Sequence, residues 1–170
     1  MKHFLLISLL LGMSMTLSAQ TLEEFTERFS KAENAEVVSL DKATLGMMMS
    51  MNPEAQNPES SEKSKKMHDI LSKLHFLKVI SLEESSESDR KAFCEAVENL
   101  TVDGLELLMD TKEESEHVRI FANIKESRCS ELVVLSASVD EPVMVHIAGD
   151  FDMDELKQLD SGMLEGIEFP

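Results

Sequence analysis

The spacing of apolar residues changes along the chain, from a helical period in the first half to a two-residue alternation in the second. In the first half, Leu22, Phe25 and Phe29 recur on one side of a helix, and Thr21 pairs with Glu24 in the order of a capping box. Short runs rich in β-branched residues lie between the helical stretches and predict strands. We expect helices over 21–31, 43–50, 62–74 and from Ser86 onward, and strands over 36–42 and 75–83.

The second half predicts four more strands, separated by polar breaks of hairpin length: 105–112, 117–125, 131–137 and 142–149. Within 118–124, apolar residues at even positions alternate with Arg119 and Asn123, which indicates one buried and one wetter sheet face. We expect the helices to cover the apolar face. The predicted fold is an α+β two-layer sandwich, with a mostly antiparallel sheet and helices on one face. A short helix over 151–159, capped by Asp152, closes the domain.

Residues 1–19 have the layout of a secretory signal peptide: a basic start, an apolar run and a small-residue exit ending at Ala19. We expect cleavage before Gln20, a single domain over 20–162 and a C-terminal tail over 163–170. No cysteine lies near the cleavage point, so we do not expect a lipoprotein. No later apolar stretch is long enough for a transmembrane segment. The expected location is the periplasm or the cell exterior.

Composition argues against several classes of partner. The chain has a formal net charge of −17, whereas nucleic acids and anionic membranes are bound by clustered lysine and arginine. It contains neither Trp nor Tyr, so the aromatic platforms that commonly hold sugars and bases are missing. The two cysteines, Cys94 and Cys129, have no C-x-x-C spacing, and the sequence leaves open whether they pair.

Three strings resemble an exported bacterial family: VVSLDKATLGMM, HFLKVISLE and, above all, ELVVLSASVDEPVMVHIAGDFDMDELKQL. On these strings the chain resembles DUF4252, a domain of unknown function whose members look like Bacteroidetes envelope proteins. The resemblance spans nearly the whole chain after the signal peptide. It implies a fold and a compartment. It brings no catalytic residues, because the family has no established activity.

A methionine cluster is the first candidate site. Thioether sulfur is a soft ligand that suits Cu(I), and Met47, Met49 and Met51 are closely spaced, with His68 beyond the next loop. The alternative is that Met47 and Met51 share a helix face and fill the core. The spacing favours core filling, because no histidine stands at a fixed short distance from the cluster.

The other chemistry-bearing residues form no established motif. GDFDMDEL begins like a calcium loop, but Glu155 and Ser161 occupy the positions that such a loop reserves for Gly and Glu. A nucleophilic enzyme needs a histidine and an acid beside Cys94 or a serine, and no G-x-S-x-G occurs. The remaining histidines show no metal-binding spacing: His68, His75, His117 and His146. We therefore expect no enzyme and no cofactor.

The favoured hypothesis is an interaction module. The wetter sheet face mixes apolar and polar side chains, as docking surfaces do: Arg119, Phe121, Asn123, Met144 and His146. The alternative is that helices or the tail cover this face too. The sequence thus favours an exported, non-catalytic envelope protein that binds a partner protein, and the second hypothesis is a Cu(I)-binding protein. It specifies neither the partner nor the oligomeric state.

Overall fold

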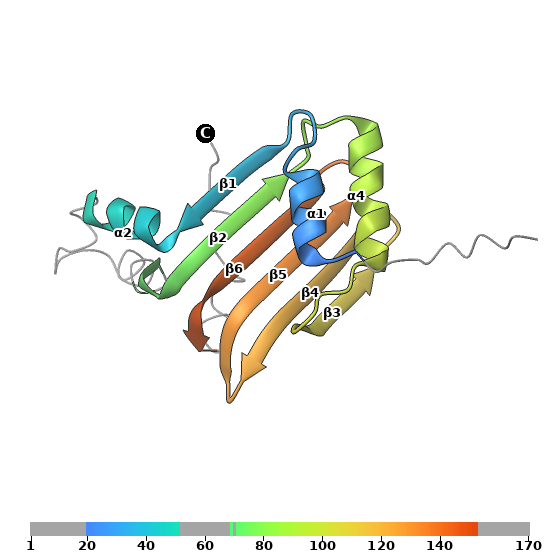
Figure 1. Cartoon of the computed structure of the whole chain (residues 1–170). Coiled ribbons are helices and arrows are strands. Elements are labelled where there is room, and N and C mark those ends of the chain that lie inside the picture. The colour runs from blue at the N-terminus through green and yellow to red at the C-terminus, as the bar shows by residue number, and fades with distance from the viewer. Residues whose placement is uncertain (1–19, 52–68, 70, 153–170) are drawn as a thin grey trace, which may run out of the picture.

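Six strands form one antiparallel sheet, and two helices lie across one face of it (Figure 1). The computed structural model describes residues 20–51, 69 and 71–152. The elements in chain order are α1 (Leu22–Phe29), β1 (Glu36–Asp41), α2 (Lys42–Met51), β2 (Leu74–Ser81), α4 (Glu87–Asn99), β3 (Glu106–Lys112), β4 (Glu116–Lys125), β5 (Arg128–Ser138) and β6 (Val143–Asp152). The strand order is β1-β2-β6-β5-β4-β3. The predicted α+β fold is confirmed.

Two helices begin at the residues that the sequence predicts. At α1, Thr21 Oγ1 accepts a hydrogen bond from the Glu24 amide at 3.2 Å, and the Glu24 carboxylate accepts one from the Thr21 amide at 3.1 Å. At α4, Ser86 Oγ accepts from the Asp89 amide at 3.1 Å. These side chains satisfy backbone amides that have no partner within the helix, which fixes where each helix starts.

The main core lies between the sheet and the helices α1 and α4. Phe25, Phe29 and Phe93 form a three-ring cluster with centroid distances of 4.7 to 5.0 Å. Each of the three side chains is almost completely buried, and burial of such a side chain is worth about 2 kcal/mol. Below them, the sheet contributes Ile80 and Leu135.

The helices cover the opposite sheet face from the one that we expected. Phe121 and Met144 are 4% and 0% exposed, and Arg119, on the same face, is 9% exposed. Val118 and Ile120, expected under the helices, point to the other face and are half-buried. Arg119 can lie on the helix-covered face because its guanidinium hydrogen-bonds backbone carbonyls at the C-terminal end of α4. The apolar alternation therefore identified two faces correctly but assigned the helices to the wrong one.

A second buried cluster joins α2 to the sheet: Leu45, Leu74, Ala122, Cys129 and Phe151. Here β6 runs on through Asp152, where we expected a helix to have begun. The backbone at Gly149 is tightly packed, since a Cβ there would lie 2.4 Å from the Phe151 ring. The strand continues because Phe151 and Asp152 pair with Cys129 and Arg128 of β5.

Several sequence predictions lie outside the described residues: the signal peptide, the rest of the expected C-terminal helix and the tail. Of the helix expected over 62–74, residues 69 and 71–73 are described and are helical. Among the described helices, none is long and apolar enough to cross a membrane.

The two ends of the sheet are the strands β1 and β3. On β3, the side chains of Leu107, Leu108 and Met109 are exposed, and a bulge interrupts its pairing with β4 at Leu108. The β4–β5 hairpin turns through Glu126 and Ser127, whose φ angles are 49° and 68°. Positive φ at both central residues is the geometry of a hairpin turn that favours Asn and Gly.

Candidate functional site

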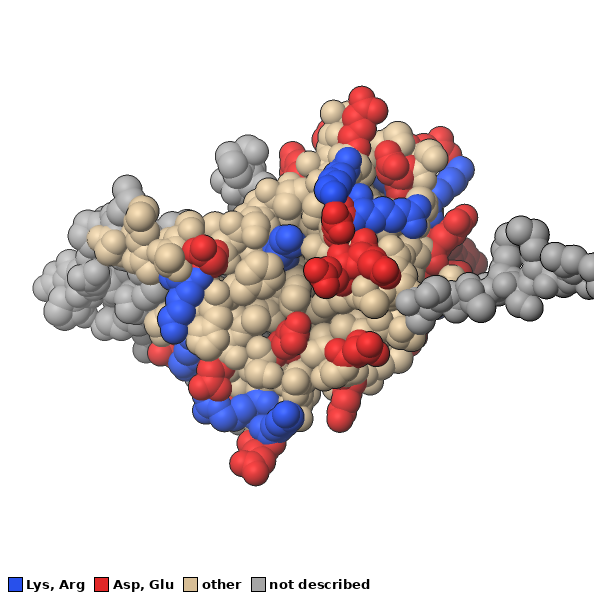
Figure 2. Space-filling model, viewed as in Figure 1, with Lys and Arg blue, Asp and Glu red and all other residues tan. Residues whose placement is uncertain are grey.

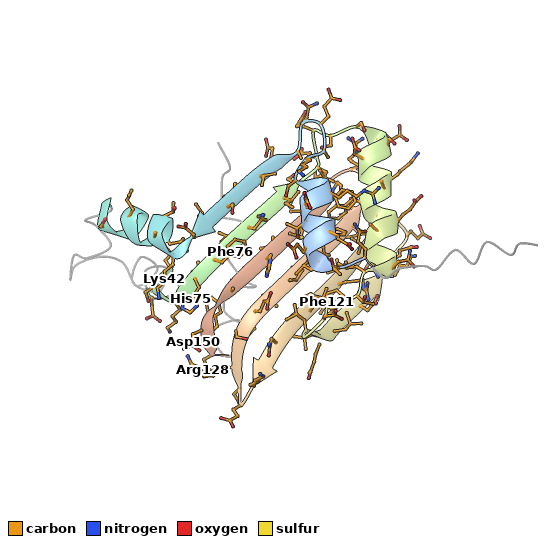
Figure 3. All side chains as sticks on the ribbon, in the orientation of Figure 1. Lys42, His75, Phe76, Phe121, Arg128 and Asp150 are labelled. Atoms are coloured by element: carbon orange, nitrogen blue, oxygen red, sulfur yellow. The ribbon has the colours of Figure 1, made fainter. Side chains whose placement is uncertain are left out.

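An open groove of about 600 Å³ lies between α1 and the strands β2 and β6. One wall is the side of α1 that carries Leu22, Thr26 and Ser30, spaced four residues apart. Figure 3 shows Phe76 on β2, on the part of the sheet that α1 leaves uncovered. The groove exists because α1 and α4 lie side by side over one part of the sheet and leave most of β2 and part of β6 open on the helix side (Figure 1).

The floor of the groove is built by strand pairing. Lys78 on β2 lies directly opposite His146 on β6, and Phe76, two residues earlier on β2, points to the same face. The Phe76 ring packs edge-on against the His146 imidazole, with centroids 5.3 Å apart. His146 Nε2 hydrogen-bonds Glu131 Oε1 on β5 at 2.8 Å, which fixes the imidazole in place.

The α1 wall of the groove is bonded to β6, and it contains one buried polar atom that has no hydrogen-bond partner among the described residues. Thr26 Oγ1 donates to Met144 Sδ at 3.8 Å, which links the helix to β6. The hydroxyl of Ser30 is buried and has no hydrogen-bond partner among the described residues. Ser30 therefore leaves one donor and acceptor at the groove without a bond.

Two of the charged side chains around the groove pair with each other: Lys31 and Glu27, at 2.6 Å on the rim. His146 is hydrogen-bonded to Glu131 at 2.8 Å. Lys78, half-buried on the floor, forms no ion pair or hydrogen bond through its side chain in the described part of the chain. Figure 2 shows that the surface over β2 and β6 is mostly uncharged, while acidic and basic side chains gather over α1 and α4.

Of the five residues that the sequence proposed as a contact surface, His146 lines the groove. Phe121 and Met144 are core residues, and the alternative that helices cover them is correct. Asn123 is half-buried on β4 and does not line the groove. The predicted surface is therefore not continuous, and of its five residues only His146 lines the groove.

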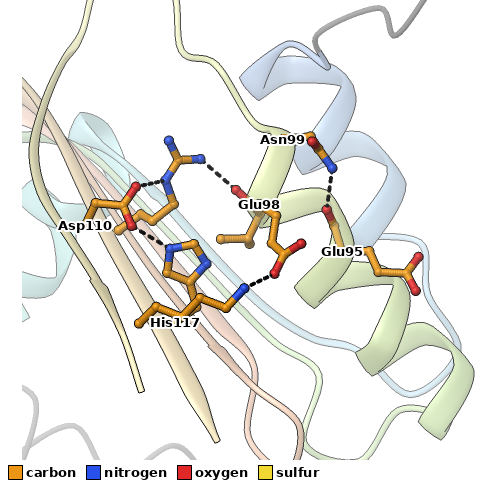
Figure 4. Close-up of polar contacts among 8 residues, drawn as sticks. Glu95, Glu98, Asn99, Asp110 and His117 are labelled. Carbon is orange, nitrogen blue, oxygen red and sulfur yellow. Dashed lines mark hydrogen bonds and ion pairs between the residues drawn. The ribbon is translucent and has the colours of Figure 1, made fainter. Parts of the chain in front are cut away.

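Arg119 has a structural role (Figure 4). Its guanidinium donates to the carbonyls of Val97 and Leu100 at 2.7 and 2.9 Å, at the C-terminal end of α4, and to Asp110 at 3.2 Å. Asp110 also binds His117 at 2.7 Å. That hydrogen bond, together with the charge of Arg119, lowers the pKa of Asp110 below its ordinary value. The network fastens α4 to β3 and β4, because a cation satisfies the free carbonyls at a helix end.

The methionine cluster is described only at Met47. That side chain is 65% exposed on α2, so Met47 does not fill the core as the alternative interpretation required. The side chains of Met49 and Met51, and the whole of His68, lie outside what the structure describes.

The acidic and histidine candidates are dispersed. Asp150 pairs with Arg128 at 2.6 Å, and Asp152 lies within β6. His75 is exposed at the start of β2. Within residues 20–51, 69 and 71–152, no three His, Cys, Asp or Glu side chains are placed to hold a metal ion.

The two cysteines are free and lie in different clusters. Cys94 on α4 packs beside the main core, and its Sγ donates to the Ser138 carbonyl at 3.5 Å. Cys129 on β5 is buried in the second cluster. Burial raises the pKa of both thiols above the ordinary value. Both thus remain protonated at neutral pH and are poor nucleophiles.

Sequence reasoning missed Phe76 and Lys78. Their alternation with Leu77 and Val79 marks them as same-face neighbours, which is a signal the sequence does contain. What it does not contain is the pairing of β2 with β6, whose partners Lys78 and His146 are far apart in the chain.

A protein-family model described as a domain of unknown function, DUF4252, matches residues 29–159. No curated protein and no solved structure matches the chain.

Proposed function

Because the chain belongs to the DUF4252 family, which carries no assigned activity, we propose its function from its own surface: an exported, non-catalytic binding module of the bacterial envelope. The observation that carries the proposal is the groove between α1 and the strands β2 and β6. A concave, mostly apolar site with a few fixed polar groups is the usual form of a binding site.

Export is supported by the N-terminal sequence. Residues 1–19 combine a basic start, an apolar run and a small-residue exit. The proposal expects the protein in the periplasm or outside the cell to begin at Gln20. Mass measurement of the protein recovered from cell envelopes tests this, and an intact N-terminus in the recovered protein would contradict it.

A binding role, rather than catalysis, is supported by the bonds around His146. Its Nε2 is held by Glu131, and in the described chain neither Ser30 nor a cysteine hydrogen-bonds the imidazole. An activated nucleophile needs such a bond to its base. The bond from Glu131 holds the imidazole in place in the groove, which supports a binding role.

Site-specific photocrosslinking in cells that make the protein tests the binding role. A photoreactive residue at Leu22 or Phe76 places the probe in the groove, whereas one at Glu87 places it on the exposed side of α4. We expect discrete adducts from the groove positions and none from Glu87. Equal labelling from all three positions, or none from the groove, would argue against the groove as the binding site.

A second candidate function is Cu(I) binding through Met47, Met49 and Met51. The observation that favours it is the exposure of Met47, which leaves its sulfur open to an ion. Thermal melts with Cu(I) under reducing conditions should show a saturable rise that disappears when all three residues become Leu, since only a ligand of the folded state raises stability. An equal rise in the triple variant would remove this candidate.

A further inference from the structure

We propose that the groove binds an amphiphilic carboxylate: an acyl chain that lies along the apolar lining and ends in a carboxylate bound by Lys78. The proposal rests on the proposed function and names the chemistry of the ligand.

The charge on the groove floor indicates the head group. Lys78 is half-buried between two strand neighbours that do not neutralise it, Ser39 on β1 and His146 on β6. A partly desolvated ammonium without a counter-ion is unfavourable, and an incoming carboxylate supplies a charge-assisted hydrogen bond. The other basic side chains of the groove, Lys31 and His146, already have carboxylate partners, Glu27 and Glu131.

The acidic residues of the groove do not cancel this preference. Glu27 is ion-paired with Lys31 at 2.6 Å, and Glu131 is hydrogen-bonded to His146 at 2.8 Å, so neither carboxylate is bonded to Lys78 in the described part of the chain. Glu23 lies in the first turn of α1, where the helix dipole favours a negative charge. The net charge of −17 repels anions at long range, so contact with Lys78 must supply the selectivity.

The lining indicates an acyl chain rather than a peptide. The floor strands β2 and β6 pair with strands on both sides, and α1 bonds its own backbone, so the groove offers few free backbone donors or acceptors. The backbone amides of a peptide bound there would lose their hydrogen bonds to water and find few partners in the groove, which costs free energy. An alkyl chain against Leu22 and Phe76 loses no hydrogen bonds and gains apolar contact.

Calorimetry on the purified protein tests the proposal, with amphiphiles kept below the concentrations at which they form micelles. Dodecanoate should bind, and dodecyltrimethylammonium, with the same tail and the opposite charge, should bind at least tenfold more weakly. Lys78→Met should weaken dodecanoate binding about tenfold, and Lys78→Arg should retain it. The matched control Lys125→Met removes an exposed lysine at the end of β4 and should change nothing. Lys78→Glu should reverse the preference toward the cationic amphiphile.

A reporter in the groove locates the binding. Because the chain has neither Trp nor Tyr, Phe76→Trp places the only indole of the protein in the groove, and dodecanoate should shift its emission to shorter wavelength. An unshifted emission during calorimetric binding would place the ligand elsewhere and overturn the proposal.

Further outcomes separate this proposal from the proposed function. If Leu22→Asp abolishes binding but Lys78→Met does not, the groove binds apolar chains and the carboxylate contact is wrong. If an apolar peptide binds only with a free C-terminus and needs Lys78, whereas dodecanoate does not bind, the ligand is a peptide and the acyl chain is wrong. If no amphiphile binds while groove photocrosslinks persist in cells, the ligand chemistry fails and the binding role stands. Loss of both overturns both.

Discussion

Replacement of Arg119 by methionine removes the side chain that fastens α4 to the sheet. The guanidinium is 9% exposed and donates to two carbonyls at the C-terminal end of α4, those of Val97 and Leu100. It also stacks over the Phe121 ring, with the guanidinium carbon 4.8 Å from the ring centroid. Methionine keeps much of the apolar volume but donates no hydrogen bond, so the Leu100 carbonyl loses its bond from Arg119 and the Val97 carbonyl keeps only its bond from the Leu100 amide.

The expected loss is large relative to the stability of a domain of this size. Each hydrogen bond from a charged donor is worth about 1.5 to 3 kcal/mol, and a buried polar group left unpaired carries a desolvation cost. Two such bonds give an expected loss of about 3 to 6 kcal/mol in the free energy of unfolding. Since that free energy is typically about 5 to 15 kcal/mol, Arg119→Met should lose a large share of its stability.

Urea unfolding followed by far-UV circular dichroism measures the effect, because the chain has no Trp or Tyr for fluorescence. Arg28→Met is the matched control: Arg28 also stacks on a phenylalanine at 4.8 Å but is exposed, and its side chain binds no carbonyl among the described residues. The control should lose about 1 kcal/mol or less. If Arg119→Met costs no more than Arg28→Met, the carbonyl bonds do not hold α4 and the reasoning is refuted.

Three further predictions concern single positions. The pKa of Asp110 is lowered from its ordinary value of 3.8, chiefly by His117, so its ionised form stabilises the fold above that pH and the contribution is lost as the pH falls below it. Urea unfolding at several pH values should show a stability difference between wild type and Asp110→Asn that vanishes in acid, and a difference unchanged at low pH would contradict this. Ser127→Gly should raise stability by about 1 kcal/mol, seen as a higher melting temperature, because Ser127 has a φ of 68° that glycine adopts without strain. Gly149→Ala should cost about 1 to 3 kcal/mol in the same melts, because its Cβ would lie 2.4 Å from the Phe151 ring and 2.6 Å from the Lys73 carbonyl oxygen; an unchanged melting temperature would contradict the tight packing at Gly149.

Local signals in the sequence predicted the elements well. Thr21 with Glu24 and Ser86 with Asp89 mark helix starts because the capping bonds join residues three apart. The polar breaks between β3, β4, β5 and β6 predicted the hairpins because two strands joined by a short connection can pair only in the antiparallel direction. These features depend on contacts between residues close in the chain.

The choice of covered face depends on distant contacts, and there the sequence misled. A charged residue on a strand normally indicates the solvent side, yet Arg119 lies under α4 because helix carbonyls accept its hydrogen bonds. Phe121 and Met144 share that face, and the phenylalanines of α1 and α4 pack over it. In the alternation pattern both sheet faces carry apolar residues, so the pattern alone does not indicate which face the helices cover.

The groove was only partly predictable for the same reason. His146 was named from the sequence, but its neighbour Lys78 lies on a strand formed much earlier in the chain. Only the insertion of β6 beside β2 brings the two side chains together, and no local pattern encodes that insertion.

The position of β6 also sets the order in which the molecule can assemble. The last described strand to be synthesised lies inside the sheet, between β2 and β5. Until Val143–Asp152 has emerged from the ribosome, the β1–β2 pair and the β3–β4–β5 meander have no strand to join them. The nascent chain thus stays without its complete sheet until β6 has been synthesised, and pairings over such long sequence separations form slowly. For a protein that we propose to be exported, we expect this late completion of the sheet to favour transport of the chain before it folds.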